Sequence, residues 1–262
     1  MLTKHKERYA RQAALPQIGR CGQERFAVAK VVIVGCGGLG TVSAELLARA
    51  GVGHLRLVDD DCVEAANLIG QTLYDEGDAQ AGQLKVVAAS RRLECLNPTI
   101  HIEPVVARLT ARNADGLIAG ADLVLDGTDN ATARYLINSA CLREGIPWIY
   151  GAVLESFGLT MNVVPGETPC FVCTFGPPPY HSGGNGRGTR CLAAATHVVA
   201  SFQVSQALQL LLDGKYGRGL VYVDAWGPAL EKIEVKSPSA GCPACGRRSG
   251  GQETHLAGAS RL

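Results

Sequence analysis

A short apolar run that ends in a cluster of glycines constrains the fold of this chain more than any other feature. Residues 31–34 read Val-Val-Ile-Val, and they are followed by Gly35-Cys36-Gly37-Gly38-Leu39-Gly40 and by a segment with helical spacing of apolar residues. A strand, a glycine turn and a helix in this order are typical of a dinucleotide-binding unit. Phosphates can approach the turn closely, and the positive end of the helix favours their charge. The glycines expected at such a site are Gly35, Gly37, Gly38 and Gly40.

Further apolar runs alternate with helical patterns up to residue 150. This alternation predicts an α/β fold with a Rossmann-like, doubly wound and mostly parallel sheet. After Gly151 strands predominate, so the C-terminal half is expected to add antiparallel strands. The expected strands are 31–34, 55–58, 100–105, 123–125, 148–150, 159–164, 220–223 and 230–235, and the expected helices are 41–50, 79–96, 110–119, 130–144 and 191–213.

Composition limits the partners and the location of the protein. Its 25 Lys and Arg against 24 Asp and Glu give a net charge of +1, which supplies no overall field for nucleic acid or an anionic membrane. Residues 1–8 lead into further polar residues, and no run of 18 apolar residues follows, so neither a secretory signal nor a membrane span is expected. Several of the ten cysteines lie singly in apolar or helical segments, which suits reduced thiols and a cytoplasmic location.

Carboxylates stand at the ends of two expected strands. Asp59 ends the second strand about 20 residues after the last glycine, where a carboxylate can accept from ribose hydroxyls. Asp126-Gly127-Thr128-Asp129-Asn130 closes the fourth strand, at the edge where open α/β sheets bind ligands. A carboxylate beside phosphates can hold Mg²⁺. Asp129 is therefore a predicted magnesium ligand, and a helix-capping role for Asp129 or Asn130 is an alternative that does not exclude the metal.

Two C-x-x-C pairs predict a metal site. Cys170 and Cys173 form the first pair, and Cys242 and Cys245 form the second. Together they supply four thiolates for a structural zinc knuckle that would tie the end of the chain to its middle. A redox-active pair is the alternative, but neither pair lies in the strand-to-helix context that lowers one thiol's pKa. Four protein ligands leave the metal no open position for catalysis.

Taken in order, these motifs resemble the ThiF/MoeB/HesA family, the bacterial relatives of ubiquitin-activating enzymes, over residues 7–247. The resemblance implies an adenylyltransferase that uses ATP and Mg²⁺ to activate the C-terminal glycine carboxylate of a ubiquitin-like sulfur-carrier protein ending in Gly-Gly. The carrier would then accept sulfur as a thiocarboxylate, for thiamine, molybdopterin or a related metabolite. The additional motifs are Arg8-Tyr9-Ala10-Arg11-Gln12, Ala50-Gly51-Val52-Gly53, Asp59-x-Asp61, Asn67 and Gly82-Gln83-Leu84-Lys85.

The resemblance also assigns roles to single residues. It implies that Gly38 approaches the phosphates, that Asp59 holds the ribose, and that Asn67 and Lys85 contact the nucleotide and its phosphates. Asp61 belongs to the same set of nucleotide-binding residues. Asp129 would ligate Mg²⁺ with Asn130 beside it. Arg11 would reach across a homodimer interface to the partner's triphosphate. Cys191 would form a covalent link with the carrier. Catalytic roles thus fall to Arg11, Lys85, Asp129 and Cys191.

The implied organisation is a single domain over residues 1–262. It comprises a nucleotide-binding half (27–150), a carrier-binding and zinc-binding half (151–247) and a disordered tail (248–262). No rhodanese-like extension follows the second cysteine pair, so a separate sulfur-donor protein is expected.

One position departs from the family pattern. The family commonly has Asn-x-x-Arg-Gln after the acidic pair, whereas here Gly70 stands at the arginine's place. We hypothesise that Arg187 or Arg190, in a glycine-rich loop, compensates. Three other functions stay open: adenylation of a peptide or tRNA-linked carboxylate, nucleotide binding without turnover, and a nicotinamide-dependent dehydrogenase, which the cysteine pairs and Asp129 disfavour.

Overall fold

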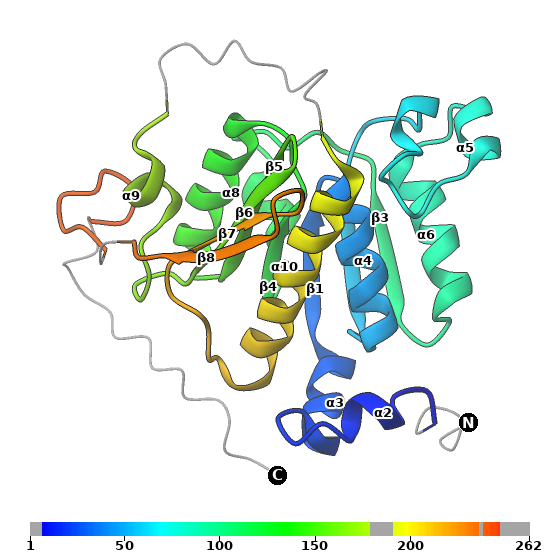
Figure 1. Cartoon of the computed structure of the whole chain (residues 1–262), viewed down its shortest axis with the longest axis horizontal. Helices are drawn as coiled ribbons and strands as arrows, with labels where there is room; N and C mark the ends of the chain where they lie inside the picture. Colours follow the sequence, from blue (N-terminus) through cyan, green and yellow to red (C-terminus); the bar gives the residue numbers. More distant parts are fainter. Residues whose placement is uncertain (1–6, 179–190, 236–237, 247–262) are drawn as a thin grey trace.

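A single eight-stranded sheet forms the centre of the protein (Figure 1). The computed structural model describes residues 7–178, 191–235 and 238–246. The strand order is β3-β2-β1-β4-β5-β6-β7-β8, with parallel pairing from β3 to β5 and antiparallel pairing from β5 to β8. This order confirms the predicted sheet and its antiparallel extension. The strands are β1 (Lys30–Val34), β2 (His54–Val58), β3 (His101–Val105), β4 (Leu123–Asp126), β5 (Trp148–Leu154), β6 (Phe157–Val163), β7 (Leu220–Asp224) and β8 (Ala229–Ile233).

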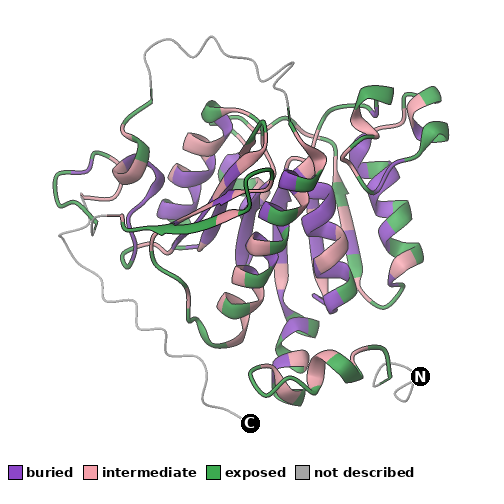
Figure 2. Cartoon of the chain, viewed as in Figure 1, coloured by how far each residue is buried: buried purple, intermediate pink, exposed green. Residues whose placement is uncertain are grey.

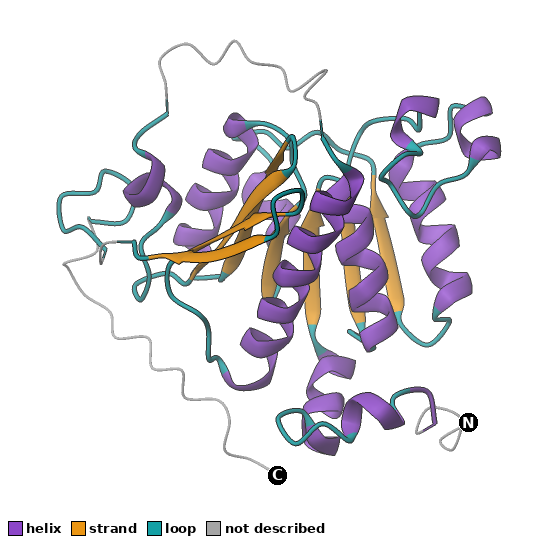
Figure 3. Cartoon of the chain, viewed as in Figure 1, coloured by secondary structure: helices purple, strands orange, loops and turns teal. Residues whose placement is uncertain are grey.

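Helices cover both faces of the sheet, as Figure 3 shows. Alternate residues of β1 explain this arrangement, because Val31 and Ile33 join one apolar cluster and Val32 and Val34 join another. The central strands are correspondingly buried (Figure 2). One face is covered by α4 (Gly38–Ala50), α6 (Lys85–Leu96) and α10 (Ala193–Asp213), and the other by α7 (Ala114–Ile118), α8 (Ala131–Glu144) and α9 (Phe171–Phe175).

The single helix expected over 79–96 is wrong, because the chain forms two helices there. They are α5 (Glu76–Gln80) and α6, and between them Gly82 has a φ of +56°. Residues 83–85 turn instead toward the segment after β2, where the Lys85 N–H donates to the Asp61 carbonyl at 2.9 Å. This pairing ends α5 and brings Lys85 to the carboxyl edge of the sheet.

The helix expected over 110–119 is also shorter than predicted. It begins only at Ala114, because the Asn113 side chain accepts a hydrogen bond from the Thr110 N–H at 2.7 Å and holds residues 110–113 in a turn. The tail 248–262 lies outside the described residues. No helix in the described ranges is both long and apolar enough to cross a membrane. The described residues also form α2 (Ala10–Ala13), α3 (Gly19–Val28) and the 3-10 helix η1 (Ala65–Asn67).

Candidate active site

Three loops meet at the carboxyl edge of the sheet, after β1, β2 and β4. The loops after β1 and β4 touch through their backbones, because the Gly127 N–H donates to the Val34 carbonyl at 2.8 Å. A Cβ at Gly127 would lie 2.4 Å from the Gly35 carbonyl oxygen, and a Cβ at Gly35 would lie 2.6 Å from that of Gly127. Only glycine permits this contact. The order β2-β1-β4 also places the contact where the strand order reverses, which is the ligand-binding position of an open α/β sheet.

The glycines of the turn differ in how much space surrounds them. A Cβ at Gly40 would lie 1.9 Å from the Gly35 carbonyl oxygen, so Gly40 is required for the turn itself. A Cβ at Gly37 would meet only the Gly127 oxygen, at 3.8 Å, so there is room beside Gly37. Among the described residues, no side chain caps the N-terminus of α4. The N–H groups of a helix's first turn have no partner within the helix, so this end of α4 fits an anionic ligand such as phosphate.

Asp59 holds the glycine turn in place. One carboxylate oxygen accepts from the Cys36 N–H at 2.6 Å, and the other accepts from the Asp61 N–H at 2.8 Å. Burial raises the pKa of Asp59, although these two backbone donors oppose the effect. Asp59 is thus where the sequence predicts it, beside the glycines, and contact with a ribose stays a prediction.

Lys85 and Asp61 form an ion pair beside Asp59. The Lys85 Nζ lies 3.1 Å from an Asp61 carboxylate oxygen, and the lysine side chain is 9% exposed against 68% for the aspartate. The loop after β2 continues to Asn67, whose side-chain oxygen accepts from the Glu64 N–H at 3.0 Å and so shapes η1. The structure therefore brings Asp59, Asp61 and Lys85 together, and it places Asn67 on a neighbouring turn.

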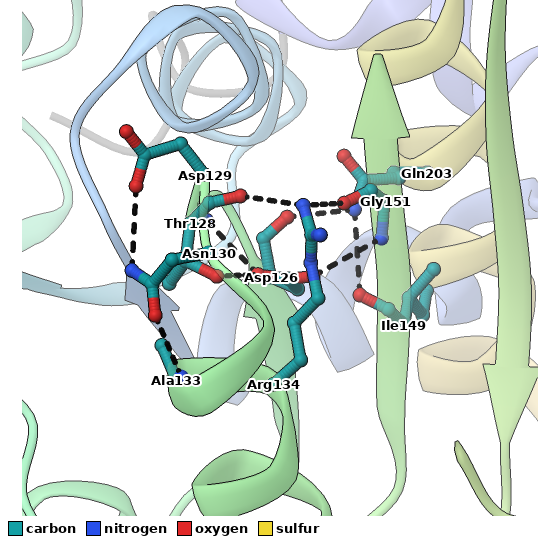
Figure 4. Close-up of polar contacts among 9 residues, drawn as sticks. All are labelled: Asp126, Thr128, Asp129, Asn130, Ala133, Arg134, Ile149, Gly151 and Gln203. Carbon is teal, nitrogen blue, oxygen red and sulfur yellow. Dashed lines mark hydrogen bonds and ion pairs between the residues drawn. The ribbon is translucent and has the colours of Figure 1, made fainter. Parts of the chain in front are cut away.

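Two aspartates, one at the end of β4 and one in the loop that follows, lie in different environments (Figure 4). Asp126 is buried, and its carboxylate accepts hydrogen bonds from Thr128 and Arg134. Asp129 is exposed, and its carboxylate accepts from the Asn130 amide at 3.3 Å. Asn130 in turn caps α8 by accepting from the Ala133 N–H at 2.9 Å, which confirms the capping alternative for that residue. Asp129 is the carboxylate of this loop that remains available to a cation, so the loop fits Mg²⁺.

Two residues that support this region, Gln203 and Arg134, were not identified from the sequence. Gln203 on α10 donates from Nε2 to the Asp126 carbonyl at 3.0 Å, and Arg134 lies in the first turns of α8 with a side chain 14% exposed. An arginine near the start of a helix opposes the helix dipole. Arg134 therefore occupies an unfavourable position in the helix, and it follows closely after the aspartates at the end of a strand. These two facts could have indicated from the sequence that Arg134 pairs with a carboxylate.

Cys191 lies close to the glycine turn. Its Sγ is 3.0 Å from the Thr196 Oγ1, and a Cβ on Gly38 would lie 2.8 Å from the Thr196 methyl group. The exposed Cys191 thiol is thus separated from Gly38 by one side chain. Gly70 lies nearby, where a Cβ would be 3.6 Å from the Ala193 Cβ in ordinary contact. The proposed substitutes for the missing arginine, Arg187 and Arg190, lie outside the described residues.

Arg11 lies far from the glycine turn of its own chain. It is exposed on α2, and the neighbouring Gln12 donates to the Ala50 carbonyl at the C-terminal end of α4. Because the 13 residues of α4 rise about 1.5 Å each, this end is about 20 Å from the glycine turn. Figure 1 likewise shows α2 and α3 beyond the N-terminal end of β1. Within one chain Arg11 does not reach the site.

The four cysteines of the two pairs converge at α9. Their sulfurs lie 3.8 Å apart for Cys170 and Cys173, 3.7 Å for Cys170 and Cys242, and 3.4 Å for Cys173 and Cys245. Four sulfurs placed tetrahedrally 2.3 Å from zinc lie about 3.8 Å from one another. Burial opposes ionisation of Cys242, but the backbone N–H groups of Cys245 and Ala244 lower its pKa to about 7. The cluster therefore fits zinc.

Comparison with known proteins gives consistent matches. A family model described as the ThiF family matches residues 9–244. The chain is 40% identical to the sulfur carrier protein ThiS adenylyltransferase of Bacillus subtilis over 92% of its own length and 72% of that protein. It is 39% identical to the adenylyltransferase and sulfurtransferase MOCS3 of Sus scrofa over 92% of its own length, but it spans only 53% of that protein.

The fold is similar to that of E. coli MccB. The crystal structure of that protein superposes with a TM-score of 0.80 at 24% identity, and the match covers 96% of this chain and 75% of MccB. At this level of identity the comparison supports the fold alone.

Proposed function

The chain belongs to the ThiF family, and on that basis we propose that it adenylates the C-terminal glycine carboxylate of a ubiquitin-like sulfur-carrier protein. The relatives named as adenylyltransferases support this proposal. The observation that carries it is the contact between the glycine turn and the loop after β4, at Gly35 and Gly127. This contact puts an uncapped helix N-terminus and an exposed carboxylate, Asp129, at one edge of the sheet. Such a pairing suits a metal-bound triphosphate better than a nicotinamide.

The chemistry needs no general base. A C-terminal carboxyl group has a reference pKa of about 3.5, so the carrier's tail is ionised at neutral pH. One of its oxygens attacks the α-phosphorus of ATP, a P–O bond forms, and the bond to the bridging oxygen breaks as pyrophosphate leaves. Two anions must therefore be aligned and their repulsion reduced, which is the work of positioning and charge neutralisation.

The protein supplies that environment from several elements. The N–H groups at Gly37 and Gly38 and the start of α4 receive the phosphates, and Lys85 leaves Asp61 to add a positive charge. Asp59 holds the ribose, and Asp61 and Asn67 contribute to the nucleotide site. Asp129, with Asn130 beside it, holds Mg²⁺, which when bound neutralises phosphate charge. In this proposal residues 27–150 bind the nucleotide and residues 151–247 bind the carrier, while Cys170, Cys173, Cys242 and Cys245 hold a structural zinc.

Two catalytic residues are proposed to act from outside the nucleotide half. The distance of Arg11 from its own glycine turn supports a role in the site of a second copy of the chain, within a homodimer. The position of Cys191 one side chain from Gly38 supports attack of its thiolate on the carbonyl carbon of the adenylated carrier, which forms a thioester as AMP leaves.

Exchange of labelled pyrophosphate into ATP tests the proposal. The reaction is run with Mg²⁺ and a purified ubiquitin-like sulfur carrier ending in Gly-Gly, and the same carrier without its last glycine is the control. We expect exchange with the intact carrier alone. Exchange that depends on a short peptide or an RNA would point to a different carboxylate substrate, and ATP binding without exchange would identify a non-catalytic module.

A further inference from the structure

We propose that Arg134 is a positioning residue for the magnesium ligand Asp129, acting through the buried carboxylate of Asp126. This inference rests on the proposed function, because it requires Mg²⁺ at Asp129. Arg134 lies on α8, and its side chain extends from this helix to a position between Thr128 and Gly151 (Figure 4).

The side chain of Arg134 ties three strand and loop segments together. Its Nε donates to the Asp126 carboxylate at 3.0 Å. Its Nη2 donates to the carbonyl of Thr128 at 2.8 Å, within the loop, and to the carbonyl of Gly151 at 3.2 Å, in β5. A guanidinium can make these contacts at once because its donors lie in a rigid plane, whereas an ammonium is a single point charge.

Asp126 passes this constraint to the loop. The carboxylate oxygen that does not meet Nε accepts from the Thr128 N–H at 2.9 Å and from the Thr128 hydroxyl at 2.7 Å. Thr128 is therefore held on both sides, by Asp126 at its N–H and by Arg134 at its carbonyl. Asp129 follows Thr128 directly, so the direction of its backbone is set by these bonds. The Asp126 side chain is fully buried and already hydrogen-bonded, so it supports the loop. Asp129 is the residue that would bind the metal.

An aromatic ring fixes Arg134 from the other side. The guanidinium carbon lies 5.3 Å from the centre of the Tyr150 ring, within range of a cation–π interaction. The Tyr150 ring in turn lies 5.3 Å from that of Phe171, the residue after Cys170. Burial opposes the charge on Arg134, but the neighbouring Asp126 carboxylate raises the pKa of the guanidinium on balance. The Arg134 side chain is thus charged and held in one position by its contacts.

The test measures how much Mg²⁺ strengthens nucleotide binding. The dissociation constant of a non-hydrolysable α,β-methylene ATP analogue is measured by calorimetry with Mg²⁺ and again with EDTA, and the ratio of the two constants is the metal enhancement. We expect Arg134→Lys to bind the analogue normally in EDTA but to reduce the enhancement about tenfold, toward the value for Asp129→Asn. The matched control is Arg143→Lys, an exposed position on the same helix that pairs with Asp115.

The outcomes separate the two proposals. No metal enhancement in the wild-type protein would overturn the magnesium site at Asp129, and with it this part of the proposed function, whatever Arg134 does. A normal enhancement in the wild type that Arg134→Lys leaves unchanged would overturn the role of Arg134 alone, as would equal weakening with and without metal. If Arg134→Lys does not fold, Thr128→Val removes the hydroxyl bond to Asp126 with little change in shape. We expect that variant to lower the enhancement about threefold, and an unchanged value would contradict the inference.

Discussion

A methyl group at Gly37 should block the nucleotide without disturbing the fold. Gly37 has a φ of −83°, which alanine adopts, and the nearest atom to a Cβ there is the Gly127 oxygen at 3.8 Å. Replacing glycine by alanine at a compatible position stabilises by about 0.4–1 kcal/mol through the unfolded chain. Alanine is a poorer N-cap residue than glycine, which offsets this gain. Gly37→Ala should therefore change stability by less than about 1 kcal/mol, or a few degrees in Tm.

Nucleotide binding by Gly37→Ala should fall much further. If phosphates approach the backbone at this position, the added methyl group occupies their space, and a loss of about 1.4 kcal/mol or more weakens ATP binding at least tenfold. Calorimetry with Mg-ATP measures this change, and thermal melting checks the fold.

Gly40→Ala provides the contrast, because its Cβ would lie 1.9 Å from the Gly35 oxygen. It should lose about 3 kcal/mol or more of stability. Normal ATP affinity in a folded Gly37→Ala protein would refute the phosphate role of the turn.

The remaining predictions concern Gly70, the cysteines and Arg11. Gly70→Arg should fold normally, since a Cβ there makes only ordinary contact with Ala193. It should raise the rate of pyrophosphate exchange about tenfold by restoring a cation. An unchanged rate would show that the site does not lack a positive charge at this position. Cys242→Ser should bind less zinc by mass spectrometry and melt at least several degrees lower, whereas full zinc content would contradict the four-thiolate site. Arg11→Ala and Asp129→Asn should each be inactive, yet their mixture should recover about a quarter of wild-type exchange, because half of randomly reassociated dimers carry one complete site. No recovery would contradict an arginine supplied to the site by the second chain.

The sequence predicts the elements that depend on local pattern. The β-branched run before Gly35 and the two C-x-x-C spacings lead directly to β1 and to the cysteine cluster. Each of these signals is contained in a few consecutive residues. The break between α5 and α6 has another origin, because it depends on pairing between residues 83–85 and the segment at Asp61, which lie apart in the sequence.

The supporting network of the site was harder to predict for the same reason. Asp126 and Arg134 are recognisable as charged residues, but nothing in the sequence shows that Asp126 is buried while Asp129 is exposed. That difference arises from the packing of α8, β5 and α10 around the end of β4. Gln203 comes from a helix 77 residues away, and it resembles any other polar residue of an apolar helix until its contact with the Asp126 carbonyl is seen.

The most direct test is a crystal structure with Mg²⁺ and a non-hydrolysable ATP analogue. The phosphates should lie on the backbone N–H groups of Gly37 and Gly38, and the metal should lie about 2.1 Å from an Asp129 carboxylate oxygen. A nucleotide bound at any other edge of the sheet, or a metal held without Asp129, would contradict the proposed site.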